Sequence, residues 1–302
     1  MVKLLRRRGV LLLLLAAAMT ACRPPSPASN GSSAVRIGAL QSGGVRRSYW
    51  LRVPESPRGK LPVLIVFHGS GATGSSMMTL FDGADLERYG FLAVFPEAAE
   101  GTNATWALGC QRCTYADAAG VDDYRFVRDL LDTLAQKHDI DRARVYVTGF
   151  SLGGSFAFDL ACRFGELVSG SAIVASLPSA DELAGCRPSR PLEVLIMLGD
   201  RDPGVPWEGG GRYQYASADS SARLWASWNG CAMTPASSAL PDRNGDGNQV
   251  RVTTYSSCRD DVKVRLFRVE GVGHAWPRED LDASSEIARS FFGSAPPQPQ
   301  RP

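Results

Sequence analysis

Gly149-Phe-Ser-Leu-Gly153 has the pattern G-x-S-x-G, and it lies between the apolar run Val145-Tyr-Val147 and a helix-forming segment that begins at Ser155. A serine in this setting lies on a sharp turn from a strand to a helix, with its hydroxyl exposed. A side chain at either glycine would collide with the neighbouring strand or helix, because the backbone reverses so tightly. The motif therefore predicts a nucleophile elbow with Ser151 as the nucleophile.

A general base has to come from three histidines, His68, His138 and His274. His138 lies in a polar stretch at the end of an amphipathic helical pattern, which is typical of the surface. His68 follows the strand-like run 63–67 and precedes the serine, where a fold of this kind builds half of its oxyanion hole. His274 follows the serine and lies in the loop Gly271-Val-Gly-His-Ala-Trp-Pro277. We therefore predict that His274 is the base.

The acid is expected on a loop after a core strand, and Gly199-Asp-Arg-Asp-Pro203 follows the apolar run 192–198. Asp200 and Asp202 compete for this role. We favour Asp202, because the prolines that follow it make the loop rigid. Asp200 lies nearer the strand end and is better placed to cap the turn.

Serine, acid and histidine in this chain order predict nucleophilic catalysis. The histidine takes the hydroxyl proton, and the buried aspartate fixes the tautomer and stabilises the imidazolium. Backbone N–H groups hold the developing oxyanion, and by position these belong to Ser70 and Leu152.

Further segments occur in an order that resembles a known group, the secreted polyhydroxybutyrate depolymerase and feruloyl esterase families. The segments are Arg47-Ser-Tyr-Trp-Leu-Arg-Val-Pro54, His68-Gly69, Gly120-Val-Asp-Asp123, Gly149-Phe-Ser-Leu-Gly-Gly154, Gly199-Asp-Arg-Asp-Pro-Gly-Val-Pro206, Trp228-Asn-Gly-Cys231 and Gly273-His-Ala-Trp-Pro277. The resemblance covers most of residues 45–293. It implies the α/β-hydrolase fold shared with carbohydrate esterase family 1, which has a mostly parallel central sheet flanked by helices. It also implies that Ser151, Asp202 and His274 are nucleophile, acid and base.

The chain departs from these families at positions that bear on the substrate. Ser70 stands where the families often carry cysteine, and Trp207 where they tend to have tyrosine. Ala275 replaces the usual threonine of the histidine loop. Trp207 and Trp276 are candidates for an aromatic wall of the acyl pocket, with buried packing as the alternative.

The N-terminus predicts export. A basic segment, 3–8, precedes the apolar run 10–19, which is too short for a comfortable membrane span. Met19-Thr-Ala-Cys22 then resembles the lipobox of bacterial lipoproteins, in which Cys22 becomes a lipid-modified N-terminus after removal of residues 1–21. We expect an envelope lipoprotein held to the membrane by this anchor, on the periplasmic face or the cell surface. The alternative is plain secretion after cleavage near Ala21.

The predicted domain is single. Residues 22–34 are rich in proline and serine and predict a flexible tether, and residues 295–302 predict a disordered tail. Residues 35–294 form one catalytic domain, a normal length for one α/β-hydrolase unit.

Cysteine usage fits an oxidising compartment. The chain has seven cysteines, and a lipidated Cys22 leaves an even number. Six cysteines permit about 15 connectivities. Local proximity and the family resemblance imply the pairs Cys110–Cys113, Cys162–Cys186 and Cys231–Cys258. The alternative at the first pair is zinc, which would need two further ligands, while the other cysteines are scattered singly.

Charge excludes one class of partner. The formal net charge of +2 includes four basic residues of the signal, so the mature chain has 29 basic and 31 acidic residues, a net of −2. It has no basic patch of the kind that nucleic-acid binding requires. Asp242-Arg-Asn-Gly-Asp-Gly247 has the spacing of a calcium loop, but Thr253 stands where an EF-hand loop has its bidentate glutamate. We interpret it as a polar turn and predict no metal and no cofactor.

Alternating apolar strands and amphipathic helices indicate the α/β class. Strands are predicted near 46–53, 62–67, 91–95, 143–149, 170–176, 192–198 and 262–269. Helices are predicted near 121–138, 152–164, 218–229 and 280–292.

The leading hypothesis is a secreted serine ester hydrolase that works through an acyl-enzyme. The resemblance implies feruloyl or acetyl esters on plant polysaccharide, or short-chain polyhydroxyalkanoate esters, as the substrate. Two alternatives stay open: a serine peptidase on the same fold, and a surface lipoprotein that binds a ligand without catalysis.

Overall fold

The structure is a computed structural model that describes residues 34–57, 59–81, 84–110 and 113–293. The predicted signal peptide, the lipidation site Cys22 and the predicted tail lie outside the described residues. Contacts divide the chain into Met1–Asn30 and Gly31–Pro302, and the fold below is that of the second unit. None of the helices in the described part combines the length and the hydrophobicity that a membrane span requires.

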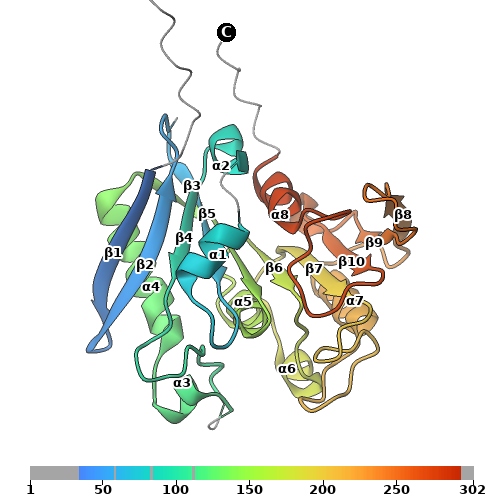
Figure 1. Cartoon of the computed structure of the whole chain (residues 1–302), viewed down its shortest axis with the longest axis horizontal. Helices are drawn as coiled ribbons and strands as arrows, with labels where there is room; N and C mark the ends of the chain where they lie inside the picture. Colours follow the sequence, from blue (N-terminus) through green and yellow to red (C-terminus); the bar gives the residue numbers. More distant parts are fainter. Residues whose placement is uncertain (1–33, 58, 82–83, 111–112, 294–302) are drawn as a thin grey trace, which may run out of the picture. The chain divides into compact units, whose positions relative to one another are not determined.

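One mixed sheet of ten strands forms the centre of this unit, in the order β1-β2-β4-β3-β5-β6-β7-β10-β9-β8 (Figure 1). The strands are β1 (Ala34–Ser42), β2 (Val45–Val53), β3 (Leu61–Phe67), β4 (Leu92–Pro96), β5 (Ile140–Phe150), β6 (Gly170–Val174), β7 (Glu193–Gly199), β8 (Ala236–Leu240), β9 (Val250–Tyr255) and β10 (Val264–Val269). The six strands from β4 to β10 in the sheet order are parallel, and the pairs at both edges are antiparallel. The predicted fold class, a mostly parallel α/β sheet, is confirmed.

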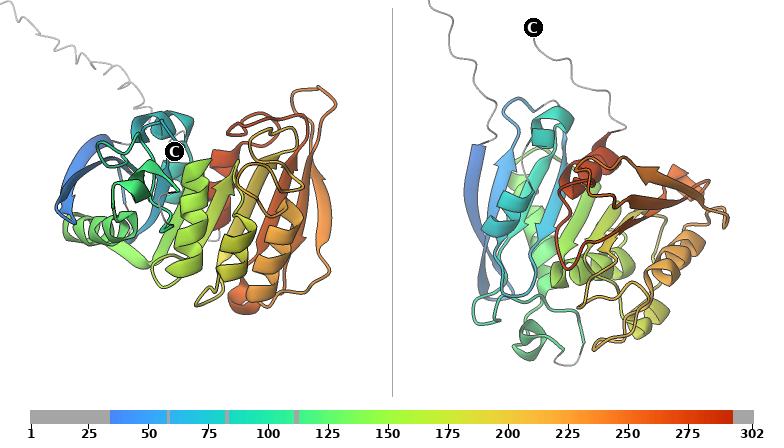
Figure 2. Two further views of the ribbon diagram at one scale, coloured as in Figure 1. Left: turned by 90° about the horizontal axis from the view of Figure 1, so that it is seen from below. Right: turned by 45° about the vertical axis from the view of Figure 1, so that its right-hand side comes forward.

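Helices cover both faces of the sheet (Figure 2). They are α1 (Gly74–Leu80), α2 (Ala84–Tyr89), α3 (Tyr115–Ala118), α4 (Asp123–Lys137), α5 (Leu152–Arg163), α6 (Ala180–Gly185), α7 (Ala218–Trp228) and α8 (Ala283–Phe292), with a short 3₁₀ turn at Arg259–Asp261. Buried side chains of α4, α5 and α7 form one core, and those of α1, α2 and α8 form the other. Strands β3, β4 and β6 are buried along their whole length, which fits central parallel strands with both faces covered.

All the predicted strands and helices are present, with ends that differ by a few residues. The elements without a prediction are β1, β8, β9 and four short helices. Four of the five side chains of β8 are exposed, so its sequence has no buried face to reveal a strand. Strand β1 includes Ala34, which the sequence analysis assigned to the tether.

The three predicted disulfides are confirmed: Cys110–Cys113, Cys162–Cys186 and Cys231–Cys258. The second joins α5 to the end of α6, and the third joins the segments that follow α7 and β9. The first pair lies within the connection between β4 and α3, so only the second and third join segments that are distant in the sequence.

A buried ion pair joins β2 to α4. The guanidinium of Arg47 lies 2.7 Å from the Asp123 carboxylate, and both side chains are at most 1% exposed. Asp123 also accepts the N–H of Ala107 at 2.8 Å, and Arg47 lies over the ring of Phe126. Removing one partner of such a pair would leave an uncompensated buried charge, which costs about 3–5 kcal/mol.

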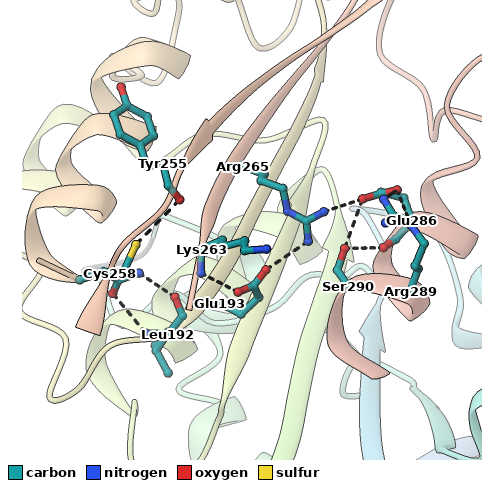
Figure 3. Close-up of polar contacts among 10 residues, drawn as sticks. Leu192, Glu193, Tyr255, Cys258, Lys263, Arg265, Glu286, Arg289 and Ser290 are labelled. Carbon is teal, nitrogen blue, oxygen red and sulfur yellow. Dashed lines mark hydrogen bonds and ion pairs between the residues drawn. The ribbon is translucent and has the colours of Figure 1, made fainter. Parts of the chain in front are cut away.

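A second charged network holds α8 against the sheet (Figure 3). Arg265 on β10 contacts Glu193 on β7 at 3.1 Å and Glu286 on α8 at 2.8 Å. All three side chains are largely buried. The network ties together the two strands whose following loops carry Asp202 and His274.

Asp159 on α5 provides a pH-dependent test of the packing. Its side chain is 3% exposed and accepts hydrogen bonds from the Tyr124 hydroxyl at 2.7 Å and from Arg163 at 3.2 Å. Burial raises the pKa of Asp159 to about 6. Because the folded-state pKa lies above the unfolded value, ionisation of this carboxyl opposes folding as the pH rises through that interval.

We expect Asp159→Asn to remove this opposition. The free energy of unfolding of the variant, relative to the wild type, should rise by up to about 3 kcal/mol between about pH 4 and about pH 7. Urea unfolding at the two pH values measures the difference. An equal difference between variant and wild type at both values would contradict the raised pKa.

Candidate active site

The predicted site residues gather at one edge of the sheet. His68, Ser151, Asp202 and His274 lie in the connections that follow β3, β5, β7 and β10 (Figure 1). Because these four strands are parallel, their carboxyl ends meet at the same edge, where open α/β sheets bind ligands.

Ser151 lies at the turn between β5 and α5 in a strained backbone conformation, with φ 54° and ψ −122°. Its N–H donates to the carbonyl of Val174 at 2.9 Å, and its own carbonyl accepts the N–H of Gly154 at 2.8 Å. The turn is held from both sides, and the Ser151 side chain is partly exposed.

The glycines of the motif permit contacts that no side chain would allow. A Cβ at Gly149 would lie 2.2 Å from the carbonyl carbon of Gly153, and a Cβ at Gly153 would lie 2.5 Å from the carbonyl oxygen of Phe67. The predicted reason for both glycines is confirmed. Helix α5 therefore begins directly against the end of β3.

We expect Gly153→Ala to force the start of α5 away from β3, since the clash is with rigid backbone. Overpacking of this kind costs about 1–3 kcal/mol, and the melting temperature should fall together with hydrolysis. Gly185→Ala is the matched control: Gly185 is also helical, and nothing lies within 4 Å of its added Cβ. Equal melting temperatures for Gly153→Ala and Gly185→Ala would contradict the predicted clash at Gly153.

His274 and Asp202 are in direct contact. The distance from His274 Nδ1 to Asp202 Oδ2 is 2.6 Å, and the Asp202 side chain is fully buried, while that of His274 is 34% exposed. The other oxygen of Asp202 accepts the N–H groups of Gly204 and Val205 at 2.8 and 2.9 Å. An ionised carboxylate is acceptor only, so Nδ1 carries the proton and Nε2 is left as a base.

A ring contact places His274 near Ser151. The imidazole of His274 packs against the ring of Phe150, the neighbour of Ser151, with ring centroids 5.0 Å apart. The histidine loop therefore lies beside the elbow.

Asp200, the competing acid, has other partners. Its carboxylate accepts the N–H of Gly271 at 2.8 Å and lies 3.4 Å from the guanidinium of Arg268. The geometry thus separates the two aspartates: Asp202 contacts the imidazole of His274, and Asp200 contacts the backbone of the histidine loop at Gly271.

His68 is buried and fixes the turn that follows β3. Its Nδ1 donates to the Gly69 carbonyl at 2.8 Å, and its Nε2 accepts the N–H of Ala98 at 3.2 Å. Burial lowers the pKa of His68, which keeps the ring neutral and suits one donor and one acceptor. Because the C=O of Gly69 and the N–H of Ser70 point in opposite directions across a trans peptide, fixing one directs the other.

The two predicted oxyanion donors lie on segments next to the serine. A Cβ at Gly69 would lie 3.3 Å from the Cβ of Ser151, which places the Gly69–Ser70 peptide beside the elbow. Leu152 is the first residue of α5, where N–H groups have no acceptor within the helix. His138, predicted to be a surface histidine, follows α4 and is partly exposed.

The two candidate pocket tryptophans lie in different places. Trp207 belongs to the core that contains α7, and its indole N–H donates to Asp219 at 3.2 Å. Trp276 belongs to the core on the opposite face, and its indole N–H donates to Ser284 at 3.1 Å. Both are at most 8% exposed. They belong to the cores on opposite faces of the sheet, which fits the alternative of buried packing.

A tyrosine pair near the acid loop was missed by the sequence analysis. Tyr215 exchanges two backbone hydrogen bonds with Gly210, and its ring lies 5.7 Å from that of Tyr213. Burial raises the pKa of Tyr215 to about 12, with smaller effects from Tyr213, Glu182 and Asp202. The one sequence signal was the run Gly209-Gly-Gly211 before closely spaced tyrosines.

The calcium-like loop brings carboxylates of Asp242, Asp246 and Asp280 within 4.8 Å of one another. Asp242 accepts the N–H of Gly245, and Asp280, from the segment before α8, accepts the N–H of Arg243, each at 2.7 Å. These are the contacts of a polar turn.

Comparison with known proteins finds similarity to one group of esterases. Residues 47–178 match the family model described as esterase PHB depolymerase. The chain is 30% identical over 202 residues to feruloyl esterase B of Piromyces equi. The aligned region covers 62% of this chain and 34% of that protein. It is 27% identical over 251 residues to feruloyl esterase C of Emericella nidulans. Here the aligned region covers 80% of this chain and 82% of that protein. Residues 47–178 thus match the esterase PHB depolymerase family, and the chain is similar to feruloyl esterases over a longer stretch.

A solved structure of another protein agrees with the fold of this chain. The acetyl xylan esterase from Aspergillus awamori is similar with a TM-score of 0.59 at 14% identity, over 85% of this chain and 99% of that one. At this identity the likeness shows the α/β-hydrolase fold. The chain spans about a third of the length of the Piromyces esterase, 34%.

Proposed function

We propose that this protein is a carboxylic ester hydrolase that works through an acyl-enzyme on Ser151. The observation that carries the proposal is the 2.6 Å contact between His274 Nδ1 and Asp202 Oδ2, at the edge of the sheet that also holds the elbow serine. The match of residues 47–178 to an esterase family model and the similarity to feruloyl esterases support it independently.

In the first step, Ser151 Oγ attacks the ester carbonyl carbon while His274 Nε2 takes the hydroxyl proton. Asp202 holds the imidazole in the required tautomer and stabilises the imidazolium. The N–H groups of Ser70 and Leu152 donate to the oxyanion of the tetrahedral intermediate. The intermediate then expels the alcohol, which takes the proton from His274, and the acyl group stays on Ser151.

In the second step, a water molecule gives its proton to His274 Nε2 and attacks the acyl carbon. Collapse of the second tetrahedral intermediate releases the carboxylic acid, and the proton returns to Ser151 Oγ. No cofactor enters either step.

The triad assignment predicts unequal effects at the two aspartates. Ser151→Ala and His274→Ala should abolish turnover, and Asp202→Asn should lower kcat about 10⁴-fold, because the amide favours the wrong tautomer of His274. Asp200→Asn should keep most of the activity. Steady-state kinetics with p-nitrophenyl acetate, with circular dichroism as the control for folding, measure all four. Equal losses at Asp200 and Asp202 would contradict the assignment of the acid.

For the substrate we propose a feruloyl ester, with acetyl esters of xylan and short 3-hydroxyalkanoate esters as the neighbouring classes. The support comes from relatives named feruloyl esterase in two fungi. The lipid anchor at Cys22 and an envelope location stay predictions, and the disulfides are consistent with a protein exported to an oxidising compartment.

A competition assay separates these substrate classes. We expect the purified protein, mixed with methyl ferulate, an acetylated xylo-oligosaccharide and a 3-hydroxybutyrate trimer, to release ferulate fastest, as read by mass spectrometry beside Ser151→Ala. Faster release of acetate or 3-hydroxybutyrate would overturn the feruloyl proposal and keep the ester hydrolase. Release of none by a folded protein would favour the peptidase or the binding-only alternative.

A further inference from the structure

Asp200 lies at the carboxyl end of β7, two residues before the proposed acid. Its side chain is only 16% exposed. One oxygen accepts the N–H of Gly271 at 2.8 Å, and the other lies 3.4 Å from the guanidinium of Arg268. Gly271 is three residues before His274, so this carboxylate joins the acid loop to the start of the histidine loop.

Backbone hydrogen bonds also join the acid loop to the histidine loop, on either side of the contact between Asp200 and Gly271. The N–H of Asp200 donates to Val269 at 3.1 Å, and the N–H of Arg201 donates to Val272 at 3.0 Å. A Cβ at Gly199 would lie 2.2 Å from the Val272 carbonyl oxygen, so the approach is as close as the chain allows. Between Val269 and Val272 the loop turns at Gly271, with φ +76°.

The carboxylate of Asp200 holds this turn from the side. A turn with positive φ has to be maintained by its surroundings. The Gly271 N–H donates to the side chain of Asp200 and not to a backbone carbonyl of a neighbouring strand. Arg268 balances the charge of Asp200, and its guanidinium also lies 5.2 Å from the ring centroid of Trp207 in the acid loop. Both catalytic loops therefore meet at Asp200.

We propose that Asp200 is a positioning residue that sets the path of the histidine loop, so that His274 Nδ1 stays on Asp202 Oδ2. The inference rests on the proposed function and deepens it. A displacement of about 1 Å in a catalytic group costs about 10²-fold in rate, and the 2.6 Å contact has little tolerance for movement of the loop.

Two substitutions test the acceptor role of Asp200. Asp200→Ala removes the acceptor for Gly271, and we expect kcat to fall about 10- to 100-fold while KM changes by less than about threefold. Asp200→Asn keeps an oxygen of the same reach, and it should restore kcat to within about threefold of the wild type. The control is Glu270→Ala at the residue before Gly271. It removes an exposed ion pair with Arg251 and should leave kcat unchanged.

The labelling rate of Ser151 by a fluorophosphonate supplies a readout that does not depend on the natural substrate. It should fall in Asp200→Ala by the same factor as kcat, because the probe needs the same activation by His274. Melting temperature and circular dichroism report whether each variant is folded.

A folded Asp200→Ala protein with the wild-type labelling rate would overturn the proposal. So would a folded Asp200→Asn protein as impaired as the alanine variant, because it would assign the effect to charge. If Asp200→Ala fails to fold, Asp200→Ser, whose shorter side chain also lacks the carboxylate, takes its place in both measurements. A wild-type protein that labels at Ser151 but hydrolyses no ester would contradict the proposed function and leave the positioning role measurable.

Discussion

The close approach of α5 to the end of β3 is the constraint on which the site depends. It exists because residues 149 and 153 have no side chain, and a Cβ at Gly153 would lie 2.5 Å from the carbonyl oxygen of Phe67. The contact forces the chain to reverse at Ser151, which takes a strained conformation at the start of the helix. It also brings the peptide after Gly69 beside the serine. One steric requirement thus places the proposed nucleophile beside the two segments that carry the proposed N–H donors, Ser70 and Leu152.

The rest of the site is assembled by parallel strands and by the loops that leave them. Strands β7 and β10 are neighbours, so the loops that carry Asp202 and His274 leave the sheet side by side. The Arg265 network holds these strands to α8, and backbone hydrogen bonds hold the loops to each other beyond the strand ends. Buried His68 serves the same purpose on the other side of the serine, since its neutral ring fixes the Gly69 carbonyl. The polar side chains of His68, Asp200 and Asp202 therefore all contact backbone groups of the site loops.

The sequence predicted the elements and residues whose pattern is local. The apolar runs at β3, β4 and β7 and the glycines around Ser151 each have a signal within a few residues. The choice between Asp200 and Asp202 had weaker support, because it depends on a contact across 72 residues of sequence. Strand β8 was missed because it is exposed and gains its structure by pairing with β9. For Trp207 and Trp276 the sequence left an aromatic wall and buried packing open, because it does not reveal that they pack on opposite faces of the sheet.

The most direct test of the account is to trap the acyl-enzyme. The protein is mixed with p-nitrophenyl acetate, quenched in acid within the first turnover, and digested for peptide mass mapping. The account predicts one acetyl group on the peptide that contains Ser151, and no such adduct in Ser151→Ala. Turnover of the ester with no acetyl group on any serine, or with the group on another residue, would contradict it.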